Sequence, residues 1–346
     1  MNKKTIMRIL DANINRSCEG IRVIEDIARF NFEDENLTNK LRNIRHNLRM
    51  DFSIFDNQFL SARDSEHDIG KVISSQSSLD KKSDIKQIIN ANLKRVAESL
   101  RVIEELTKII DYPLSKKIET FRYETYQLEK TVINKSKKII PKGLYGITAE
   151  RFANGKSNIE CVREMIKGGI KIIQYREKDK NLRVKIEEAK EISLLCKEND
   201  VTFIINDHIE ISILVDADGV HLGQNDMRVK DARIILGEYK IIGVSTHSPE
   251  QAKNAEADGA DYIGVGPIFR TNTKNTPPVG YEYLKYAVEN VKIPFITIGG
   301  IKEEHLEGII NHGAERVALV SDIVGADDIV SKIKRLEEKF KIKEIK

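Results

Sequence analysis

The hydrophobic positions of the 346-residue chain follow two patterns, which change near residue 136. In the first part apolar residues recur at three- and four-residue steps, as at Ile14, Cys18 and Ile21, a spacing that predicts amphipathic helices. In the second part short β-branched runs alternate with longer amphipathic stretches, which is typical of alternating strands and helices. We therefore predict an all-α domain over residues 1–136 and an α/β domain over residues 137–346.

The helical part contains an internal repeat. Residues 11–26 match residues 90–105 at an offset of 79, with eight of the sixteen positions identical. In the first copy these positions are Ala12, Asn13, Arg16, Glu19, Arg22, Val23, Ile24 and Glu25. A weaker match follows each copy at an offset of 80, where Arg42 aligns with Arg122. Each copy therefore predicts a helical hairpin, the two hairpins predict a four-helix arrangement, and the polar stretch 61–84 between them predicts a loop.

Eight β-branched runs mark the predicted strands of the second part. They lie at residues 143–148, 170–176, 201–206, 219–223, 240–245, 261–266, 294–299 and 316–321. Eight strands that alternate with helices over about 205 residues predict a (β/α)8 barrel, the TIM-barrel fold, with a doubly wound open sheet as the main alternative. The gap after the third strand is short, so we expect a brief helix there.

Composition narrows the possible functions. The chain is 40% apolar and 32% charged, and no apolar run approaches the roughly 20 residues of a membrane span, so we expect a globular protein without membrane partners. Cys18, Cys161 and Cys196 are far apart and odd in number, which favours buried thiols and a cytoplasmic location. The net charge is +3, without the bias of a nucleic-acid binder. We expect small-molecule substrates, and a homo-oligomer stays open.

Polar residues follow nearly every predicted strand, at the end where a (β/α)8 barrel carries its active site. They are Gln174, Arg176 and Lys178, then Asn206 and Asp207, then Asp226, Ser245, Thr271, Thr273, Lys274 and Ser321, and Gly300 and Val320 stand with them at the ends of the last two strands. Singly, such residues are most often solvated. Together they include two carboxylates without a His or Cys cluster, which suits Mg²⁺, and three cationic side chains, which suit a diphosphate. The loops after the last two strands often bind a phosphate in this fold. We interpret His221, inside an apolar strand, as a structural group.

Several motifs of the second part closely resemble the thiamine phosphate synthase family. They are "QYREK", "IINDH", "DGVHLGQND", "GVSTHS", "GADYIGVGPIFRTNTK" and "TIGGI…GAERVALVSDI", which span about residues 142–346. The resemblance implies a barrel that joins hydroxymethylpyrimidine diphosphate to thiazole phosphate, with release of diphosphate. The matching positions imply a diphosphate site at Arg176, Lys178, Asn206, Ser245 and Lys274, Mg²⁺ at Asp207 and Asp226, the pyrimidine at Gln174, and the thiazole phosphate at Thr271, Thr273, Gly300, Val320 and Ser321.

A related family, the thiazole tautomerases, shares this barrel and uses a catalytic His where this chain has Pro267. Pro267 therefore favours the synthase, and a tautomerase-like or non-catalytic relative is the alternative. Asp322 departs from the synthase pattern, because a small residue is common beside the phosphate loop. A carboxylate there would repel a phosphate, so we expect Asp322 to point away and to cap a short helix.

The helical part resembles a domain that precedes thiamine phosphate synthase in some bacteria, through "LDANINRSCEGIRVIEDIARF", "LRNIRHNL" and "SARDSEHDIG". The resemblance implies hydroxymethylpyrimidine phosphate kinase activity, with candidate site residues Asn13, Arg16, Glu19, Arg22, Glu25, Arg63, Asp64 and Asp68. No GxxxxGK phosphate loop is present, so ATP as a substrate rests on the resemblance alone. From the residues alone, the alternating Arg and Glu predict a ladder of surface ion pairs on a scaffold, and a dimerisation or docking module is the alternative.

Overall fold

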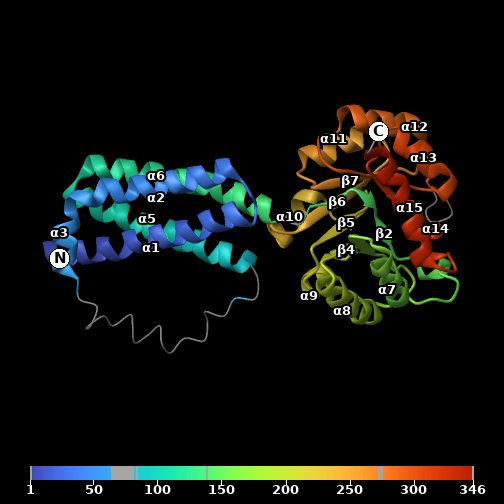
Figure 1. The fold of residues 1–346 in the computed structure, drawn as a ribbon, viewed down its shortest axis with the longest axis horizontal. Helices are drawn as coiled ribbons and strands as arrows, with labels where there is room; N and C mark the ends of the chain where they lie inside the picture. Colours follow the sequence, from blue (N-terminus) through green and yellow to red (C-terminus); the bar gives the residue numbers. More distant parts are fainter. Residues whose placement is uncertain (1, 64–81, 83–84, 138, 272–275, 345–346) are drawn as a thin grey trace. The chain divides into compact units, whose positions relative to one another are not determined.

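The computed structural model describes residues 2–63, 82, 85–137, 139–271 and 276–344. The chain forms two compact units, Met1–Ser136 and Lys137–Lys346, and each unit contains its own hydrophobic core (Figure 1). Among the described helices, none combines the length and the apolar character needed to cross a membrane.

The first unit is entirely helical within its described residues. Its elements are α1 (Lys3–Phe30), α2 (Glu35–Phe52), η1 (Ser53–Phe55), α3 (Asp56–Ala62), α5 (Ile85–Ile110) and α6 (Tyr112–Ser136). Helix α2 begins where the Asp34 carboxylate accepts a hydrogen bond from the Leu37 amide at 2.9 Å. Two hairpins, α1–α2 and α5–α6, confirm the predicted pair of repeated helical hairpins. The predicted loop 61–84 lies largely outside the described residues, and its first two positions belong to α3.

Helix α1 packs against both α2 and α5, so the first helices of the two hairpins form the centre of the unit (Figure 1). Gly20 permits this packing, because a Cβ atom there would lie 2.7 Å from Cγ2 of Val96 and 3.3 Å from the carbonyl oxygen of Asn92. The core between the helices contains fully buried aliphatic side chains such as Leu10, Ile24 and Ile103. Burial of the repeated apolar stripe therefore holds the two repeats together.

Two predictions about the repeat are wrong: the ladder of surface ion pairs along the first helices, and the alignment of the second helices. Glu25 and Glu104, equivalent in the repeat, are buried, and each carboxylate bonds an arginine of the second helix in its hairpin: Arg45 Nε at 2.8 Å and Arg122 Nε at 2.7 Å. The offset of 80 that aligns Arg42 with Arg122 is therefore also wrong, because Arg45 is the structural counterpart. Within the described residues Arg16 and Glu19 form no ion pair at all.

The second unit is a closed parallel barrel. Its strands are β1 (Gly143–Leu144), β2 (Gly146–Ile147), β3 (Ile172–Tyr175), β4 (Thr202–Asn206), β5 (Gly219–Leu222), β6 (Ile241–Thr246), β7 (Tyr262–Val265), β8 (Phe295–Ile298) and β9 (Arg316–Ala318). The sheet order is β1-β9-β8-β7-β6-β5-β4-β3-β2. The first predicted strand is thus split at Tyr145: β1 pairs with β9 and β2 pairs with β3, which closes the barrel. The structure confirms the (β/α)8 barrel and excludes the open sheet.

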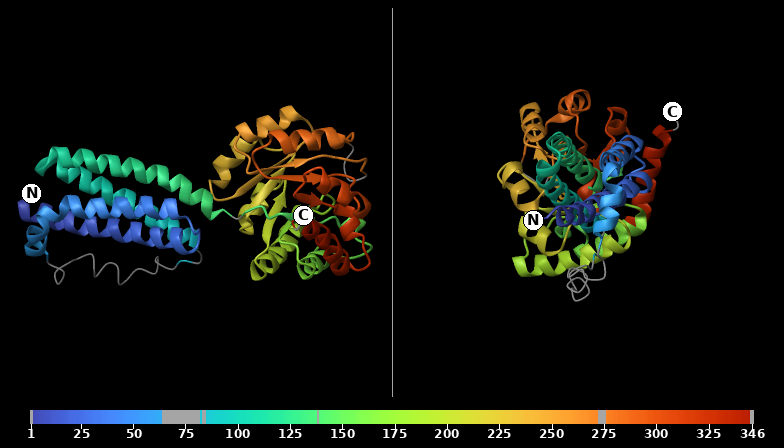
Figure 2. Two further views of the ribbon diagram at one scale, coloured as in Figure 1. Left: turned by 45° about the horizontal axis from the view of Figure 1, so that its top comes forward. Right: turned by 90° about the vertical axis from the view of Figure 1, so that its left-hand side faces the viewer.

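Helices surround the strands (Figures 1 and 2). They are α7 (Asn158–Gly168), α8 (Leu182–Glu198), α9 (Ile209–Leu214), α10 (Val229–Leu236), α11 (Pro249–Ala257), α12 (Gly280–Asn290), α13 (Glu303–Asn311), α14 (Val320–Val324) and α15 (Ile329–Glu344), with a short η2 (Glu150–Phe152). The six-residue α9 is the brief helix expected after the third strand. Cys18, Cys161 and Cys196 are all free and buried, as predicted.

Candidate active site

A pocket opens at the carboxyl ends of the barrel strands. Eight of the predicted site residues line it together: Gln174, Arg176, Asn206, Ser245, Thr271, Gly300, Val320 and Ser321. They come from strands and loops distributed around the barrel, and strand closure brings their side chains to one place. Thr273 and Lys274, which are predicted to lie beside them, fall outside the described residues.

The two predicted metal ligands lie on neighbouring loops, after β4 and β5. The Asp207 carboxylate forms an ion pair with the ammonium of Lys178. The backbone of Asp207 is left-handed, with φ of 61°, and its amide donates to the carbonyl of His221 at 2.9 Å. The Asp226 carboxylate accepts a hydrogen bond from the Gly223 amide at 2.7 Å. Carboxylate oxygens on adjacent strand ends are the hard donors that Mg²⁺ prefers.

Arg176 supplies a positive charge at the pocket and forms no ion pair within the described residues, although the carboxylates of Asp207, Glu177 and Asp179 act on it at longer range. The Thr148 hydroxyl fixes its backbone, accepting from the Arg176 amide at 2.8 Å and donating to the Arg176 carbonyl at 3.1 Å. Burial, followed by the charge of Arg151, lowers the pKa of the Arg176 guanidinium below its usual value. A half-buried cation without a counter-ion favours binding of an anionic group.

A chain of hydrogen bonds crosses the pocket floor. Gln174 Nε2 donates to the Tyr145 hydroxyl at 3.0 Å, which lies 2.8 Å from the Tyr262 hydroxyl. The His221 ring joins Tyr262 through Nδ1 at 3.0 Å and the Ser245 hydroxyl through Nε2 at 2.9 Å. Burial raises the pKa of Tyr145 to about 12 and the pKa of Tyr262 well above its usual value, so both phenols stay neutral. The chain therefore fixes the positions of Gln174 and Ser245.

Sequence reasoning missed three of these pocket residues as functional. Tyr145 and Tyr262 resemble ordinary strand core residues, and His221 is satisfied structurally, as predicted, but it also lines the pocket. Their positions within the predicted strands could have indicated a role at the pocket, because the inward-facing residues of all barrel strands share the barrel interior. His247, which follows β6, also lines the pocket, and its Nδ1 lies 2.5 Å from the carbonyl oxygen of Gly266.

The loop after β8 approaches the pocket closely. Gly300 has φ of 66°, and a Cβ atom there would lie 2.5 Å from the carbonyl oxygen of Arg270, so this turn requires glycine. Asp322 does not line the pocket: its carboxylate accepts from the Glu303 amide at 3.0 Å, at the start of α13, and forms an ion pair with Lys332 at 2.9 Å. The carboxylate thus caps a helix and points away from the pocket, as expected.

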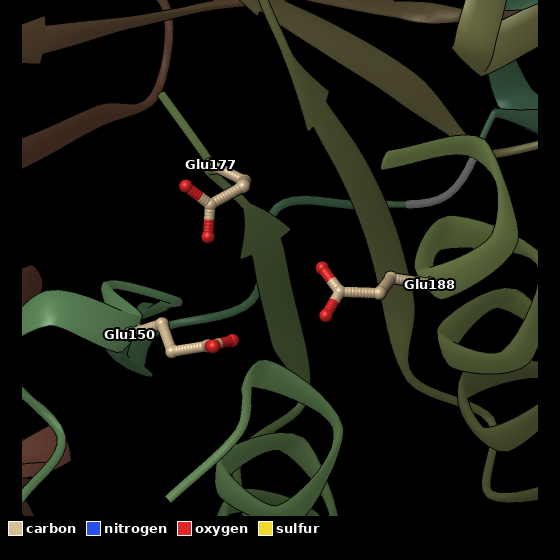
Figure 3. A group of neighbouring side chains, drawn as sticks. All are labelled: Glu150, Glu177 and Glu188. Atoms are coloured by element: carbon tan, nitrogen blue, oxygen red, sulfur yellow. The ribbon is translucent and has the colours of Figure 1, made fainter. Parts of the chain in front are cut away.

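An acidic cluster flanks the barrel near β3. The carboxylates of Glu150, Glu177 and Glu188 point toward a common centre, with oxygen atoms within 4.8 Å of one another (Figure 3). The Lys180 ammonium lies at this centre, at 2.6, 3.9 and 2.5 Å from the three residues. Burial alone would lower the pKa of Lys180, but the hydrogen bonds that its ammonium donates to Glu150 and Glu188 outweigh burial and raise the pKa. Lys180 therefore offsets one of the three negative charges and ties the loop that carries Arg176 to Glu150 and Glu188.

The candidate residues of the helical unit do not gather in one place. Arg22 and Glu25 belong to the ion-pair network around the buried Glu25 carboxylate, and Arg63 forms an ion pair with Asp11 at 2.6 Å. Glu19 is exposed, whereas Asn13 and Arg16 line a groove. Asp64 and Asp68 lie outside the described residues. The repeat therefore combines a structural half, which contains Arg22 and Glu25, with a half that faces solvent.

Comparison with known proteins identifies both units. A family model described as thiamine monophosphate synthase matches residues 144–323, and a model of the ThiD2 family matches residues 8–131. Thiamine-phosphate synthase of Synechocystis sp. is 38% identical over 323 residues, 92% of this chain and 92% of that protein.

Barrel-only relatives also match. Thiamine-phosphate synthase of Pelotomaculum thermopropionicum is 52% identical over 200 residues, 57% of this chain and 92% of that protein. The solved structure of thiamine phosphate pyrophosphorylase from Pyrococcus furiosus superposes with a TM-score of 0.54 at 36% identity, covering 58% of this chain and 96% of that one. The chain belongs to the thiamine-phosphate synthase family of transferases, with a ThiD2-family unit ahead of the barrel.

Proposed function

We propose that the barrel joins hydroxymethylpyrimidine diphosphate to thiazole phosphate. The bond between the pyrimidine methylene carbon and the diphosphate oxygen breaks, and diphosphate leaves with the electron pair. The thiazole nitrogen then forms the new carbon–nitrogen bond with its lone pair, which gives thiamine phosphate. The observation that carries this proposal is Arg176, which forms no ion pair in the described chain and lines a pocket with neutral donors, because the reaction needs charge stabilisation of a leaving group.

Each side of the pocket has a proposed role. The diphosphate meets Arg176, Lys178, Asn206, Ser245 and Lys274, and the thiazole phosphate meets Thr271, Thr273, Gly300, Val320 and Ser321. Gln174 orients the pyrimidine, and its hydrogen bond to Tyr145 fixes the amide group for this task. The two neutral phenols supply no base, in agreement with a reaction that removes no proton before the leaving group departs.

Asp207 and Asp226 would hold Mg²⁺, since both carboxylates follow adjacent strands at the mouth of the barrel. The ion would supply further positive charge for the departing diphosphate. The ion pair between Asp207 and Lys178 supports this assignment, because it brings a carboxylate and a proposed diphosphate ligand together.

Substitution of Asp207→Ala or Lys274→Ala tests the barrel site. With preformed hydroxymethylpyrimidine diphosphate, thiazole phosphate and Mg²⁺, we expect each variant to lose about 10²–10³-fold in kcat, since each removes charge from the leaving-group site. The matched control is Asp231→Ala on α10, which removes only an exposed pair with Arg228. Near-normal turnover of both site variants would refute the assignment.

For the helical unit we propose phosphorylation of hydroxymethylpyrimidine phosphate. A phosphate oxygen of that substrate forms a bond to the terminal phosphorus of ATP, the bond to the bridging oxygen breaks, and ADP leaves. The candidate residues are Asn13, Arg16, Glu19, Arg22, Glu25, Arg63, Asp64 and Asp68. The match of residues 8–131 to the ThiD2 family supports the proposal, and so does the chemistry of the barrel, which consumes the proposed product.

The full-length Asp207→Ala variant isolates this second activity, because the blocked barrel cannot consume the diphosphate. Given hydroxymethylpyrimidine phosphate and Mg·ATP, the variant is expected to accumulate hydroxymethylpyrimidine diphosphate and an equal amount of ADP, measured by ion-exchange chromatography. Absence of the diphosphate product would leave the helical unit with a dimerisation or docking role.

A further inference from the structure

A polar groove lies on the surface of the helical unit between α1 and α5. It has a volume of about 510 Å³ and is lined by Asn13, Arg16, Ala91, Lys94, Arg95, Glu98, Ser99 and Val102. Two of these residues, Arg16 and Arg95, are the same position of the internal repeat. The groove is therefore built from both copies of the repeat.

The packing of α1 and α5 explains why the equivalent residues Arg16 and Arg95 line one groove. Gly20 contacts Asn92 and Val96, whereas Asn13, which lies earlier in α1, shares the groove with the later α5 residue Val102. Contacts thus run in opposite directions along the two helices, which lie side by side and antiparallel (Figure 1). When two equivalent helices pack antiparallel, equivalent positions come near each other only around the crossing point, and Arg16 and Arg95 line the same groove there.

The charges of the groove are not balanced. Arg16, Lys94 and Arg95 are exposed, and none of them forms an ion pair within the described part of the chain. Glu98 is the one carboxylate among the lining residues. Three cations and one carboxylate leave the groove with a net positive charge, so the binding of an anion there reduces the repulsion among the cations.

Another pair of repeat arginines provides an internal comparison. Arg22 and Arg101 are also exposed, but each forms ion pairs with two carboxylates of its own helix: Arg22 with Glu25 and Asp26 at 3.1 Å, and Arg101 with Glu104 and Glu105 at 2.9 and 2.8 Å. The same helices therefore neutralise one pair of arginines fully and leave the other pair uncompensated.

The repeated asparagines also have a defined geometry. Nδ2 of Asn13 donates to the Ile9 carbonyl, and Nδ2 of Asn92 donates to the Ile88 carbonyl, both at 2.8 Å. Both side chains are buried, and Oδ1 of Asn92 has no hydrogen-bond partner in the described structure. At Asn13, which lines the groove, the same arrangement presents Oδ1 as an acceptor for a donor group of a ligand.

We propose that this groove binds the phosphate group of a phosphorylated small molecule. Arg16, Lys94 and Arg95 bind the phosphate, and Oδ1 of Asn13 accepts a hydrogen bond from an amino or hydroxyl group of the same ligand. The identity of the ligand as hydroxymethylpyrimidine phosphate rests on the proposed kinase function. Under this proposal the repeat has two roles: Arg16 and Asn13 bind the ligand, whereas Arg22 and Glu25 contribute to helix packing.

Arginine footprinting on the full-length protein locates the ligand independently of turnover. The protein is treated with phenylglyoxal alone, with hydroxymethylpyrimidine phosphate, with ATP, or with inorganic phosphate, and modified peptides are quantified by mass spectrometry. We expect hydroxymethylpyrimidine phosphate to slow modification of Arg16 and Arg95 at least about fivefold, without protection of the exposed α2 residue Arg42. Protection by ATP alone would assign the groove to the phosphate donor and overturn the assignment to the phosphorylated pyrimidine.

Binding variants complete the test. We expect R16Q/R95Q to weaken binding of hydroxymethylpyrimidine phosphate at least about tenfold by equilibrium dialysis, with thiamine phosphate present to occupy the barrel, while the helical content in circular dichroism stays unchanged. R42Q removes one exposed charge from the same unit and should retain full affinity. The proposal that the groove binds the phosphate group is wrong if R16Q/R95Q and the unaltered protein have equal affinity, or if neither arginine is protected. If the ligand protects the arginines and binds but no ADP forms, the groove is a binding site and the proposed kinase activity is wrong.

Discussion

Single residues at the pocket differ in how their charges and hydrogen bonds are satisfied. Arg176 lines the pocket and forms no ion pair in the described chain, whereas Lys180, four positions later, is surrounded by three carboxylates. Tyr262 is fully buried, and its hydroxyl is satisfied on two sides by Tyr145 and His221. Arg176 is thus available to bind an anion, whereas Lys180 and Tyr262 already have their ion-pair and hydrogen-bond partners. This combination is typical of a preorganised site.

Tyr262→Phe tests the hydrogen-bond chain of the pocket floor. The substitution removes a hydroxyl and leaves His221 and Tyr145 each without one buried partner, so we expect the barrel to lose about 1–3 kcal/mol of stability. Differential scanning calorimetry of the barrel transition measures this loss. Tyr286→Phe is the matched control, because its hydroxyl has no hydrogen-bond partner in the described chain, and it should change stability by less than about 0.5 kcal/mol. Equal effects of the two substitutions would contradict the proposed network.

At the scale of elements, each helical hairpin is joined by one buried ion pair as well as by apolar contacts. In the second hairpin, Glu104 of α5 and Arg122 of α6 retain only 3% and 9% of their side-chain exposure. In the first, Glu25 retains 6% and Arg45 retains 18%. The second pair is more completely desolvated, so loss of one of its partners is the more costly change.

Glu104→Gln should therefore destabilise the helical unit by about 3–5 kcal/mol, because it leaves the Arg122 guanidinium buried without a counter-ion. The double variant Glu104→Leu/Arg122→Leu should recover most of that stability, since it removes both charges. Denaturant unfolding followed by circular dichroism measures both effects. A double variant as unstable as the single variant would show that packing, and not the ion pair, determines the cost.

Local patterns predicted the elements well where a periodic signal existed. The β-branched runs located every strand, and their number indicated the barrel, because neither property depends on distant contacts. The split of the first strand at Tyr145 was not predictable, since it results from pairing with β9 at one end and β3 at the other. The same limit applies to the site. Charged strand ends are visible in the sequence, whereas the meeting of Tyr145 with Tyr262 depends on closure of the barrel.

At the scale of the whole molecule, the chain joins two units that have different relatives. The Synechocystis sp. protein aligns over both units, whereas the Pelotomaculum thermopropionicum protein aligns through 92% of its length within 200 residues. The helical unit is therefore an addition that some members of the family lack. An enzyme that produces the diphosphate substrate of the barrel would give this addition a direct chemical purpose.

The most direct measurement is thiamine phosphate formation by the full-length protein from hydroxymethylpyrimidine phosphate, thiazole phosphate and Mg·ATP. We expect thiamine phosphate, with one ADP and one diphosphate released for each product molecule. The R16Q/R95Q variant should form little product from the monophosphate and normal amounts from preformed hydroxymethylpyrimidine diphosphate. Product formation that requires preformed diphosphate even with the unaltered protein would contradict the claim that the two units catalyse successive steps.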